Sequence, residues 1–522
     1  MSKKFILSII MLFSCNILLF AQTNESSMTG SSITIGNTEL SLEQAIGIVL
    51  NQNLTLQSAK YDVIMSDTAY EKNMNKYGMD FNLEGGYLDQ ETPPTGSTLY
   101  SPTKLEQWDA AAYLSKKFET GTVISGGIKE TYMKSNASGL YLVPNGTGAN
   151  DVYEVSSDQW HQKPSLFVSI QQELLKNAFG FSERKQNNIS ENSVKMQRAA
   201  IINQLSGLVV STLTDYWNIT IQKSAVNTAQ AALDSNKRVR DIIARNAKYG
   251  LSEAYDMNQY NSLVANSESN LKAAEQRYHE AVRKLLRTMN MPPETSVTGV
   301  TNLVDDMPVL DEEDALKTAF AKRVDYKNAE LSLENAKMDL GVQENGVLPS
   351  LMVSLNVSTQ GSGDTDQVAD AHNDAFTGEY PTWQARAKLT YPLDNREAKA
   401  NLRNSNLKYK QAELNLKNIK LEIRDDIINK MEQVKVQHEM LMKARTANSE
   451  AELYYQNVLK RFEQGKVTSV TMKIATDYMV QSRQQALNAL VQYNVTLLLF
   501  DLAKNEIFER YHVDVEKYLK NI

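Results

Sequence analysis

The chain has 522 residues, a formal net charge of −7 and a mean hydropathy of −0.42. The mildly acidic charge, without any basic block, gives no reason to expect nucleic-acid binding, and the low hydropathy excludes a polytopic helical membrane protein. Only 11 prolines and 23 glycines interrupt the sequence, which favours long, continuous helices and strands.

The N-terminus has the layout of a secretory signal peptide. Two lysines precede the apolar run "FILSIIMLFSCNILLFA", and a polar stretch follows it. This order predicts a signal peptide over residues 1–21; a membrane anchor is the alternative, although the run is at the short limit for spanning a bilayer. Cys15 is the only cysteine, so no internal disulfide can form. Lipidation of Cys15 stays open, but Phe13 fits poorly in a lipoprotein cleavage site.

The sequence repeats itself after a shift of 270 residues, which places Ser41 on Asp311. Both are good helix N-caps, and the alternating residues 81–87 fall on residues 351–357 without a gap. Each half therefore predicts a capped helix that leads into a strand. The predicted segments are a first repeat over 22–290, a linker over 291–310, a second repeat over 311–505 and a C-terminal tail over 506–522.

The second part of each half also matches. "LFVSIQQELLKNAFGFSERK" resembles "QARAKLTYPLDNREAK", since both show an alternating strand, a short turn and a helix start. Asp394 and Glu397 have the spacing of a capping box, and Ser182 is the corresponding cap in the first half. Each half thus predicts a strand that passes directly into a helix.

Two very long helical patterns follow, and one glycine interrupts each of them, Gly250 or Gly465. Residues 183–249 alone would form a helix about 100 Å long, which must lie against equally long neighbours. The apolar residues form a narrow stripe like a coiled-coil seam. In the second half this stripe contains Leu416, Ile419, Ile423, Ile427, Met431 and Val434. The pattern predicts two helical hairpins that turn at the glycines.

Polar and apolar side chains alternate along residues 382–391, as they do along the strands of a membrane barrel. On one side, Gln384, Arg386 and Lys388 are predicted to face a water-filled lumen. On the other side the residues are apolar, and Trp383 and Tyr391 are predicted to lie at the membrane interfaces. A soluble sheet with one wet face is the alternative for this stretch taken by itself.

The first half holds an additional predicted hairpin over residues 108–133. The sequence thus predicts four strands, or six if this hairpin belongs to the same sheet. A membrane barrel needs about eight strands to close, and unpaired backbone groups in lipid cost several kcal/mol each. Several copies of the chain must therefore contribute to one barrel. The hairpin could enlarge that barrel, plug it or form an extracellular flap.

The duplicated order, the stretches "VLPSLMVSLNVS" and "LTYPLDNREAKANL" and the two glycine-centred turns resemble the TolC family of outer-membrane efflux proteins over about residues 38–508. The resemblance implies a mainly α fold with a transmembrane β-barrel: a homotrimer whose long helical hairpins form a periplasmic tunnel below one shared barrel. It also implies two partners, a periplasmic adaptor protein and an energised inner-membrane pump. The hairpin at 108–133 departs from the usual four strands per protomer.

The resemblance also implies roles for single residues. The hairpin turns would be periplasmic tips that contact the adaptor, formed by Gly250, Leu251, Ser252, Gly465, Lys466, Val467 and Thr468. Asp256 matches the acidic gate residue that follows the first tip glycine by six positions. The second half departs from the pattern, because Thr471 and Ile474 occupy its acidic positions and Phe462 replaces a tyrosine. Asp256 and Phe462 are therefore the candidate gate residues, and an acidic gate of the usual form is in doubt.

The residues point to a passive duct without chemistry of its own. The five histidines are dispersed without metal-ligand spacing, and the sequence has neither a nucleophile elbow nor a phosphate loop. We expect no catalytic residue, no metal and no cofactor. The predicted function is an outer-membrane exit duct of a Gram-negative bacterium that serves small-molecule efflux. The alternatives are a type I protein-secretion channel and, in another class, a structural coiled-coil protein of the cell surface.

Overall fold

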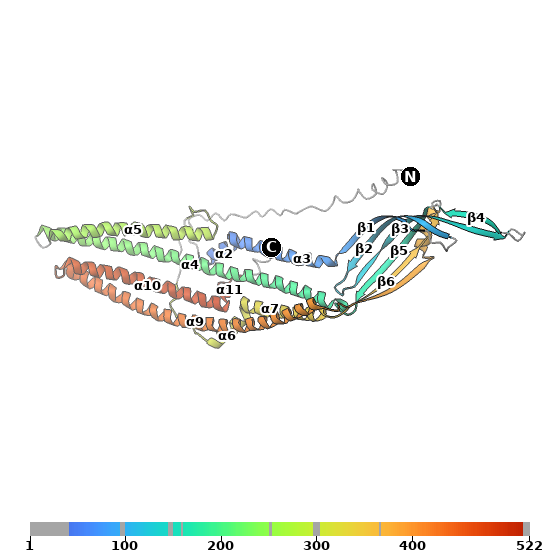
Figure 1. The fold of residues 1–522 in the computed structure, drawn as a ribbon. Helices are drawn as coiled ribbons and strands as arrows, with labels where there is room; N and C mark the ends of the chain where they lie inside the picture. The colour runs from blue at the N-terminus through green and yellow to red at the C-terminus, as the bar shows by residue number, and fades with distance from the viewer. Residues whose placement is uncertain are drawn as a thin grey trace.

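The computed structural model describes residues 41–93, 100–144, 150–157, 160–249, 253–295, 303–364 and 367–514. Within these residues the chain forms a long helical body with a β-sheet at one end (Figure 1). The predicted signal peptide with Cys15, and the first predicted tip at Gly250, Leu251 and Ser252, lie outside the described residues.

The helix that opens each repeat is two helices with a break between them. The breaks fall at Asn53 and Arg323, which are 270 residues apart, as the duplication requires. Both residues are extended, with φ −65° and ψ 124° or 130°, so the helix cannot continue through them. The predicted caps Ser41 and Asp311 are confirmed. The four helices are α2 (Leu42–Gln52), α3 (Leu54–Met74), α6 (Glu312–Lys322) and α7 (Val324–Gly346).

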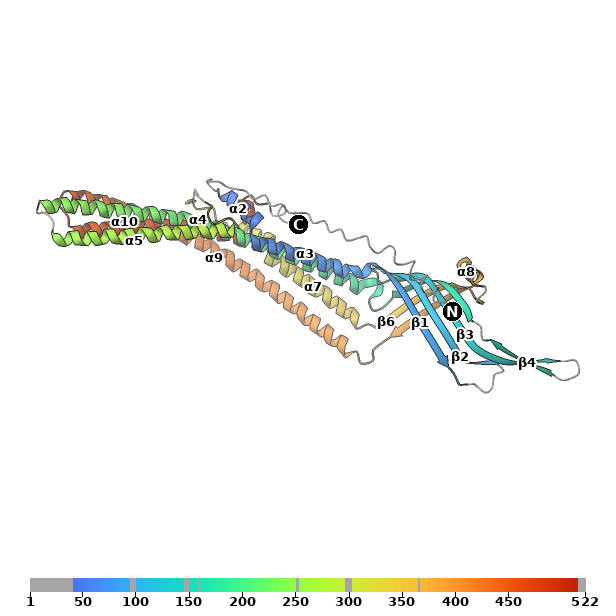
Figure 2. The ribbon, with the colours of Figure 1, turned by 90° about the horizontal axis from the view of Figure 1, so that it is seen from above.

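The two predicted helical hairpins are confirmed. Figures 1 and 2 show that both turn at the same end of the molecule, opposite the sheet. Ile423, Ile427 and Val434 of the predicted stripe are fully buried, so the stripe is the packing seam of the second hairpin. The hairpins consist of α4 (Phe181–Lys248) with α5 (Ala254–Thr288), and of α9 (Arg396–Glu463) with α10 (Ser469–Lys504).

By length and composition, α10 could cross a bilayer, with a mean hydropathy of 1.3 over its most apolar window. Half of that window is buried inside the protein, however, and Leu497, Leu498 and Phe500 belong to the core clusters that join α10 to α4 and α9. This helix is therefore apolar because it lies at the centre of the helical body.

The predicted caps of the two longest helices are wrong. Asp394 and Glu397 do not form a capping box, because the N-cap of α9 is Asn395 in a left-handed conformation without a side-chain cap. The Asp394 carboxylate instead accepts a hydrogen bond from Nε of Arg396 at 2.8 Å. Ser182 lies inside the first turn of α4 rather than before it. In both halves the tight turn out of the strand determines the conformation of the N-cap.

The sheet is antiparallel throughout, with the order β1-β2-β3-β5-β6-β8. The predicted hairpin at 108–133 is β2 and β3, which lie between β1 and β5. The sheet thus contains it, and it is neither a plug nor a flap. The long strands are β1 (Met79–Glu91), β2 (Tyr100–Lys117), β3 (Val123–Pro144), β5 (Trp160–Glu173), β6 (Ser350–Gln360) and β8 (Pro381–Thr390). β4 (Asn150–Ser157) pairs antiparallel with the last residues of β3, and β7 (Gly363–Asp364) pairs with β5.

Short elements complete the chain: η1 (Asn75–Tyr77), η2 (Ala178–Gly180), α8 (Val368–Thr377) and α11 (Ile507–Arg510). α8 packs against β5 and β6. The backbone approaches so closely there that a side chain at Gly361 would overlap the carbonyl oxygen of Ala371.

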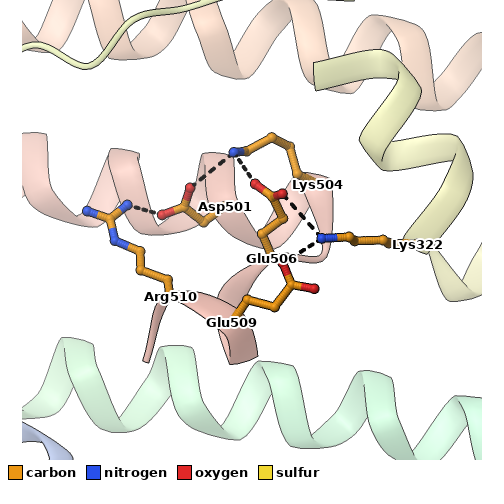
Figure 3. A network of polar contacts seen from close by, with 6 residues as sticks. All are labelled: Lys322, Asp501, Lys504, Glu506, Glu509 and Arg510. Atoms are coloured by element: carbon orange, nitrogen blue, oxygen red, sulfur yellow. Dashed lines mark hydrogen bonds and ion pairs between the residues drawn. The ribbon is translucent and has the colours of Figure 1, made fainter. Parts of the chain in front are cut away.

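An ion-pair network ties the end of α10 to α6 and α11 (Figure 3). Nζ of Lys322, the last residue of α6, lies 3.3 Å from Glu506 and also contacts Glu509. Asp501 pairs with Lys504 on its own helix and with Arg510 of α11. The network holds α6, the end of α10 and α11 together.

Acidification is expected to loosen this network. Burial by itself would raise the pKa of Glu506, but the ammonium groups of Lys504 and Lys322 more than offset burial and hold the pKa below its ordinary value of 4.5. Such a carboxyl stabilises the folded state above pH 4.5, and the contribution is lost as the pH falls through the folded-state pKa. Thermal unfolding at about pH 7 and about pH 3 measures this. Glu506→Gln should weaken the acid dependence, and the exposed Glu313→Gln should leave it unchanged.

Candidate functional site

One face of the sheet is polar and the other is apolar. Register partners on neighbouring strands lie on the same face, so the division continues across all six long strands. One register row on the polar face contains Gln384, Asn356, Ser169, Ser125, Ser115 and Asp80. The neighbouring row on the other face contains Trp383, Val357, Val168, Gly126, Leu114 and Phe81. The predicted lumen residues Gln384, Arg386 and Lys388 share the polar face. A sheet with one exposed apolar face is suited to lipid on that side and water on the other.

A single chain leaves this sheet incomplete. Among the described strands, β1 and β8 each have a partner on one side only. Six strands are too few to close a membrane barrel, which needs about eight. The unpaired N–H and C=O groups along both edges would cost several kcal/mol each in hydrocarbon. A stable membrane form therefore needs further strands at both edges.

Aromatic side chains gather on the apolar face. The predicted interface residues Trp383 and Tyr391 are 70% and 52% exposed. Sequence reasoning missed a second aromatic group, in which Tyr87 of β1 and Trp108 of β2 are register partners with ring centroids 4.5 Å apart. Tyr132 of β3 continues this row. Rows of exposed aromatic residues mark the membrane interfaces of barrels.

The junction between the sheet and α4 holds the additional hairpin in place. Gly180, with φ +75°, precedes α4, and a Cβ atom there would lie 1.8 Å from the carbonyl oxygen of Glu119 in the β2–β3 turn. Lys117 at the end of β2 forms an ion pair with Glu183 of α4. The side-chain amide of Gln172 donates to the carbonyl of Thr120 at 3.1 Å. The turn is thus fixed against the strand and helix that follow it.

Gly180→Ala is expected to destabilise this junction by about 2 kcal/mol or more. Alanine is strained in the left-handed conformation, and its Cβ atom would also clash with the backbone of Glu119. Gly207→Ala in the same helix is the matched control: no described atom lies within 4 Å of that Cβ position, and replacing a helical glycine stabilises by about 0.5–1 kcal/mol. Thermal unfolding of both variants in detergent measures the difference. Equal midpoints for the two variants would contradict the close contact.

The second predicted tip is a tight helix reversal. Gly465 has φ +68°, its N–H donates to Phe462, and the N–H of Lys466 donates to Arg461. These two bonds form a Schellman motif, which favours glycine at this position. Thr468 then caps α10 by accepting a hydrogen bond from the N–H of Thr471. At the first tip, the described neighbours Tyr249 and Tyr255 are 79% and 68% exposed.

Just above the tips, polar contacts connect the two hairpins. Oγ of Ser469 donates to Asp256 at 2.6 Å, and the hydroxyl of Tyr260 donates to the carbonyl of Ser469 at 2.9 Å. Tyr260 is fully buried; burial raises the pKa of its phenol, and the carboxylates of Asp477 and Asp256 raise it further. The hydroxyl thus stays protonated and can donate. We call these two contacts between α5 and α10 the latch.

The latch differs from what the sequence suggested. Asp256 takes part, but its partner Ser469 and the tyrosine Tyr260 were not predicted. Phe462 is 6% exposed and belongs to an apolar cluster beside the latch. Higher up, Oγ of Ser235 lies 2.9 Å from the hydroxyl of Tyr455, which is a further contact between α4 and α9.

The described part of the chain contains no group of three or more His, Cys, Asp or Glu residues that could hold a metal ion. The notable features of the site are therefore surfaces and contacts: an amphipathic sheet with two unpaired edges, a latch and two helical tips.

Comparison with known proteins agrees with this arrangement. Residues 315–498 match the outer membrane efflux protein family, while no characterised sequence matches significantly. Among solved structures, VceC of Vibrio cholerae has 13% identity and a TM-score of 0.62, covering 89% of this chain and 95% of its own. CmeC of Campylobacter jejuni has 14% identity and a TM-score of 0.62, covering 92% and 89%. MtrE of Neisseria gonorrhoeae has 14% identity and a TM-score of 0.59, covering 89% and 88%.

All three are outer-membrane proteins by description, and the latter two are described as outer-membrane channels. At these identities the likeness establishes the fold alone, long helices joined to an antiparallel sheet. The chain therefore contains a segment of the outer membrane efflux protein family, residues 315–498, within a fold similar to that of these outer-membrane proteins.

Proposed function

We propose that three copies of this chain form one passive exit duct, which docks on a periplasmic adaptor and receives small molecules from an energised inner-membrane pump. The observation that carries the proposal is the amphipathic sheet with two unpaired edges above two long helical hairpins. A trimer supplies a strand to every edge and surrounds a lumen with helices. The duct has no catalytic role in this proposal, and the pump provides the energy.

The proposed adaptor contacts are the two tips, Gly465–Thr468 and Gly250–Ser252. The exposed rings of Tyr249 and Tyr255 extend the tip at residues 250–252, because aromatic side chains are favoured at protein interfaces. Val470, Ile474 and Tyr478 are also exposed and lie on one side of α10 at helical spacing. We assign this apolar stripe to contact with a neighbouring helix in the assembled tunnel.

The proposed gate is the latch. Asp256 and Ser469 would hold the two hairpins of one copy together at the narrow end, and Tyr260 would add a second bond between them. Phe462 would support the gate through packing. In the barrel, Gln384, Arg386 and Lys388 would line the lumen, and Trp383 and Tyr391 would anchor the wall at the lipid interfaces.

Deletion of the gene tests the proposed cargo. Cells that lack the duct should retain a fluorescent efflux dye, while their secreted proteins stay unchanged. Unchanged dye retention with an altered secretome would instead identify a protein-secretion channel. Heat-modifiable electrophoretic mobility tests assembly: a trimer should dissociate only on heating. A chain that is extracted without detergent and runs as a monomer would contradict the duct and favour a structural rod.

A further inference from the structure

We infer that the assembled barrel has eighteen strands, six from each copy, and that β8 of one copy pairs with β1 of the next in the register that sets Arg386 opposite Glu84. This inference rests on the proposed trimer. A TolC-like protomer with four strands would give twelve. The difference is the β2–β3 hairpin, whose position within the sheet decides the width of the exit.

The hairpin is part of the wall because both of its outer edges are paired. β2 pairs with β1 from Met79 to Glu91, and β3 pairs with β5 from Val123 to Lys134. At Gly127 the sheet is so tight that a Cβ atom would lie 2.4 Å from Cβ of Tyr113 on β2. Moving the hairpin out of the sheet would break both of these pairings, and β1 and β5 would each need a new partner.

Most side chains of the hairpin follow the same division into two faces as the other strands; the exception in the middle of the apolar face is Glu130, which pairs with His372 of α8. On the polar face Nζ of Lys129 lies 3.5 Å from Asp109, and the hydroxyl of Thr131 donates to the same carboxylate. On the apolar face Leu114, Ile128 and Trp108 are about half exposed. A plug inside a water-filled lumen would have no reason to expose a row of large apolar residues, whereas a lipid-facing wall requires one.

The two edges are complementary. β1 leads away from the helices and β8 leads back to them, so β8 can pair with β1 of the next copy in antiparallel fashion. On the polar face, β1 carries Asp80 and Glu84, while β8 carries Arg386 and Lys388. Opposite charges across paired strands are stabilising. The β1 edge is thus acidic and the β8 edge is basic.

One register satisfies both faces. If Arg386 lies opposite Glu84, then on the apolar face Trp383 lies opposite Tyr87, Ala385 opposite Gly85, and Leu389 opposite Phe81. Trp383 would thereby extend the aromatic row of Tyr87 and Trp108 across the subunit boundary. A shift by one residue would reverse the faces. A shift by two would set Lys388 opposite Glu84 or Asp80, but it would separate Trp383 from Tyr87 and lose the aromatic pair.

The number of strands determines the width of the barrel through which cargo would leave. Barrel diameter grows roughly linearly with strand number, and barrels of about 16–18 strands leave an aqueous channel. A barrel of eighteen strands would be about one and a half times as wide as one of twelve. Selection of cargo would then fall to the latch at the helical end, since the barrel itself would no longer be the narrow part.

Cysteine pairs test the inference, because the natural chain has a single cysteine, Cys15, within the predicted signal peptide. Ser125→Cys with Ser169→Cys joins β3 to β5, whose positions are register partners, and should give an intrachain disulfide detected by mass spectrometry. Gly86→Cys with Gln384→Cys should give covalent dimers and trimers on denaturing gels. Heat-modifiable mobility of each reduced variant verifies that it folds and assembles.

The matched control is Ala111→Cys with Gln384→Cys. Ala111 lies on the same face but one strand further in, about 10 Å from the partner edge, so it should not crosslink. Covalent trimers from the Gly86 pair without the Ser125–Ser169 disulfide would overturn the eighteen-strand barrel and leave the proposed trimer intact. Crosslinking of the Ala111 pair would overturn the register. A monomeric protein in every variant would overturn the proposed function as well.

Discussion

Loss of the Asp256 carboxylate together with the Tyr260 hydroxyl will open the periplasmic end of the duct and raise its single-channel conductance. In the double variant Asp256→Ala, Tyr260→Phe, both bonds of the latch to Ser469 disappear. A hydrogen bond to a charged group contributes about 1.5–3 kcal/mol and a neutral one about 0.5–1.5 kcal/mol. Losing both bonds shifts the free-energy difference between closed and open hairpins by about 2–4 kcal/mol in each copy. The equilibrium constant for opening then rises thirtyfold or more.

Planar-bilayer recordings measure the conductance, and cell sensitivity to a large hydrophilic antibiotic measures the leak. Lys272→Ala is the matched control, because it removes an exposed ion pair with Glu275 on the same helix and such pairs contribute little. Tyr260→Phe by itself should have a smaller effect than Asp256→Ala, since its bond is neutral. If the double variant assembles as a trimer and conducts like the wild type, the latch does not control the entrance.

The sequence predicted the periodic features of this protein well. Alternation of polar and apolar residues identified the strand at 382–391, and helical spacing identified the packing seam through Ile423 and Val434. The internal duplication predicted the same order of elements in both halves of the chain. These patterns are local and repeat along the chain. The breaks at Asn53 and Arg323 escaped notice because the helical pattern continues through them. The position of Arg323 depends on distant contacts: its guanidinium donates to Asp426 of α9 and to the carbonyl of Ala503.

The features that the sequence did not reveal depend on pairs of residues far apart in the chain. The place of the 108–133 hairpin follows from contacts such as Gly180 with Glu119, which no periodicity encodes. Asp256 was found through resemblance, yet its partner Ser469 lies 213 residues away. Nothing in the local sequence distinguishes Tyr260, and only its hydrogen bond to the Ser469 carbonyl does so. Tertiary pairing of this kind is settled by packing rather than by local pattern.

Reversing the charge of Arg386 is expected to break the trimer. In the proposed register Arg386→Glu places two carboxylates opposite each other at all three subunit boundaries. Like charges across paired strands destabilise by about as much as opposite charges stabilise, so each boundary loses on the order of 1 kcal/mol. All three subunit boundaries lose this stabilisation at once, and strand edges that become unpaired are costly in lipid. Heat-modifiable mobility should show dissociation at a clearly lower temperature than for the wild type.

The charge reversal has a rescue and a control. Glu84→Arg combined with Arg386→Glu restores opposite charges in exchanged positions and should recover most of the trimer stability. Lys163→Glu changes the net charge equally, but Lys163 lies on β5 between its two neighbouring strands and should have little effect. Raised salt should reduce the difference among these variants, because charges in a water-filled lumen are screened. If Glu84→Arg fails to rescue while Arg386→Glu by itself dissociates the trimer, the strands pair in another register.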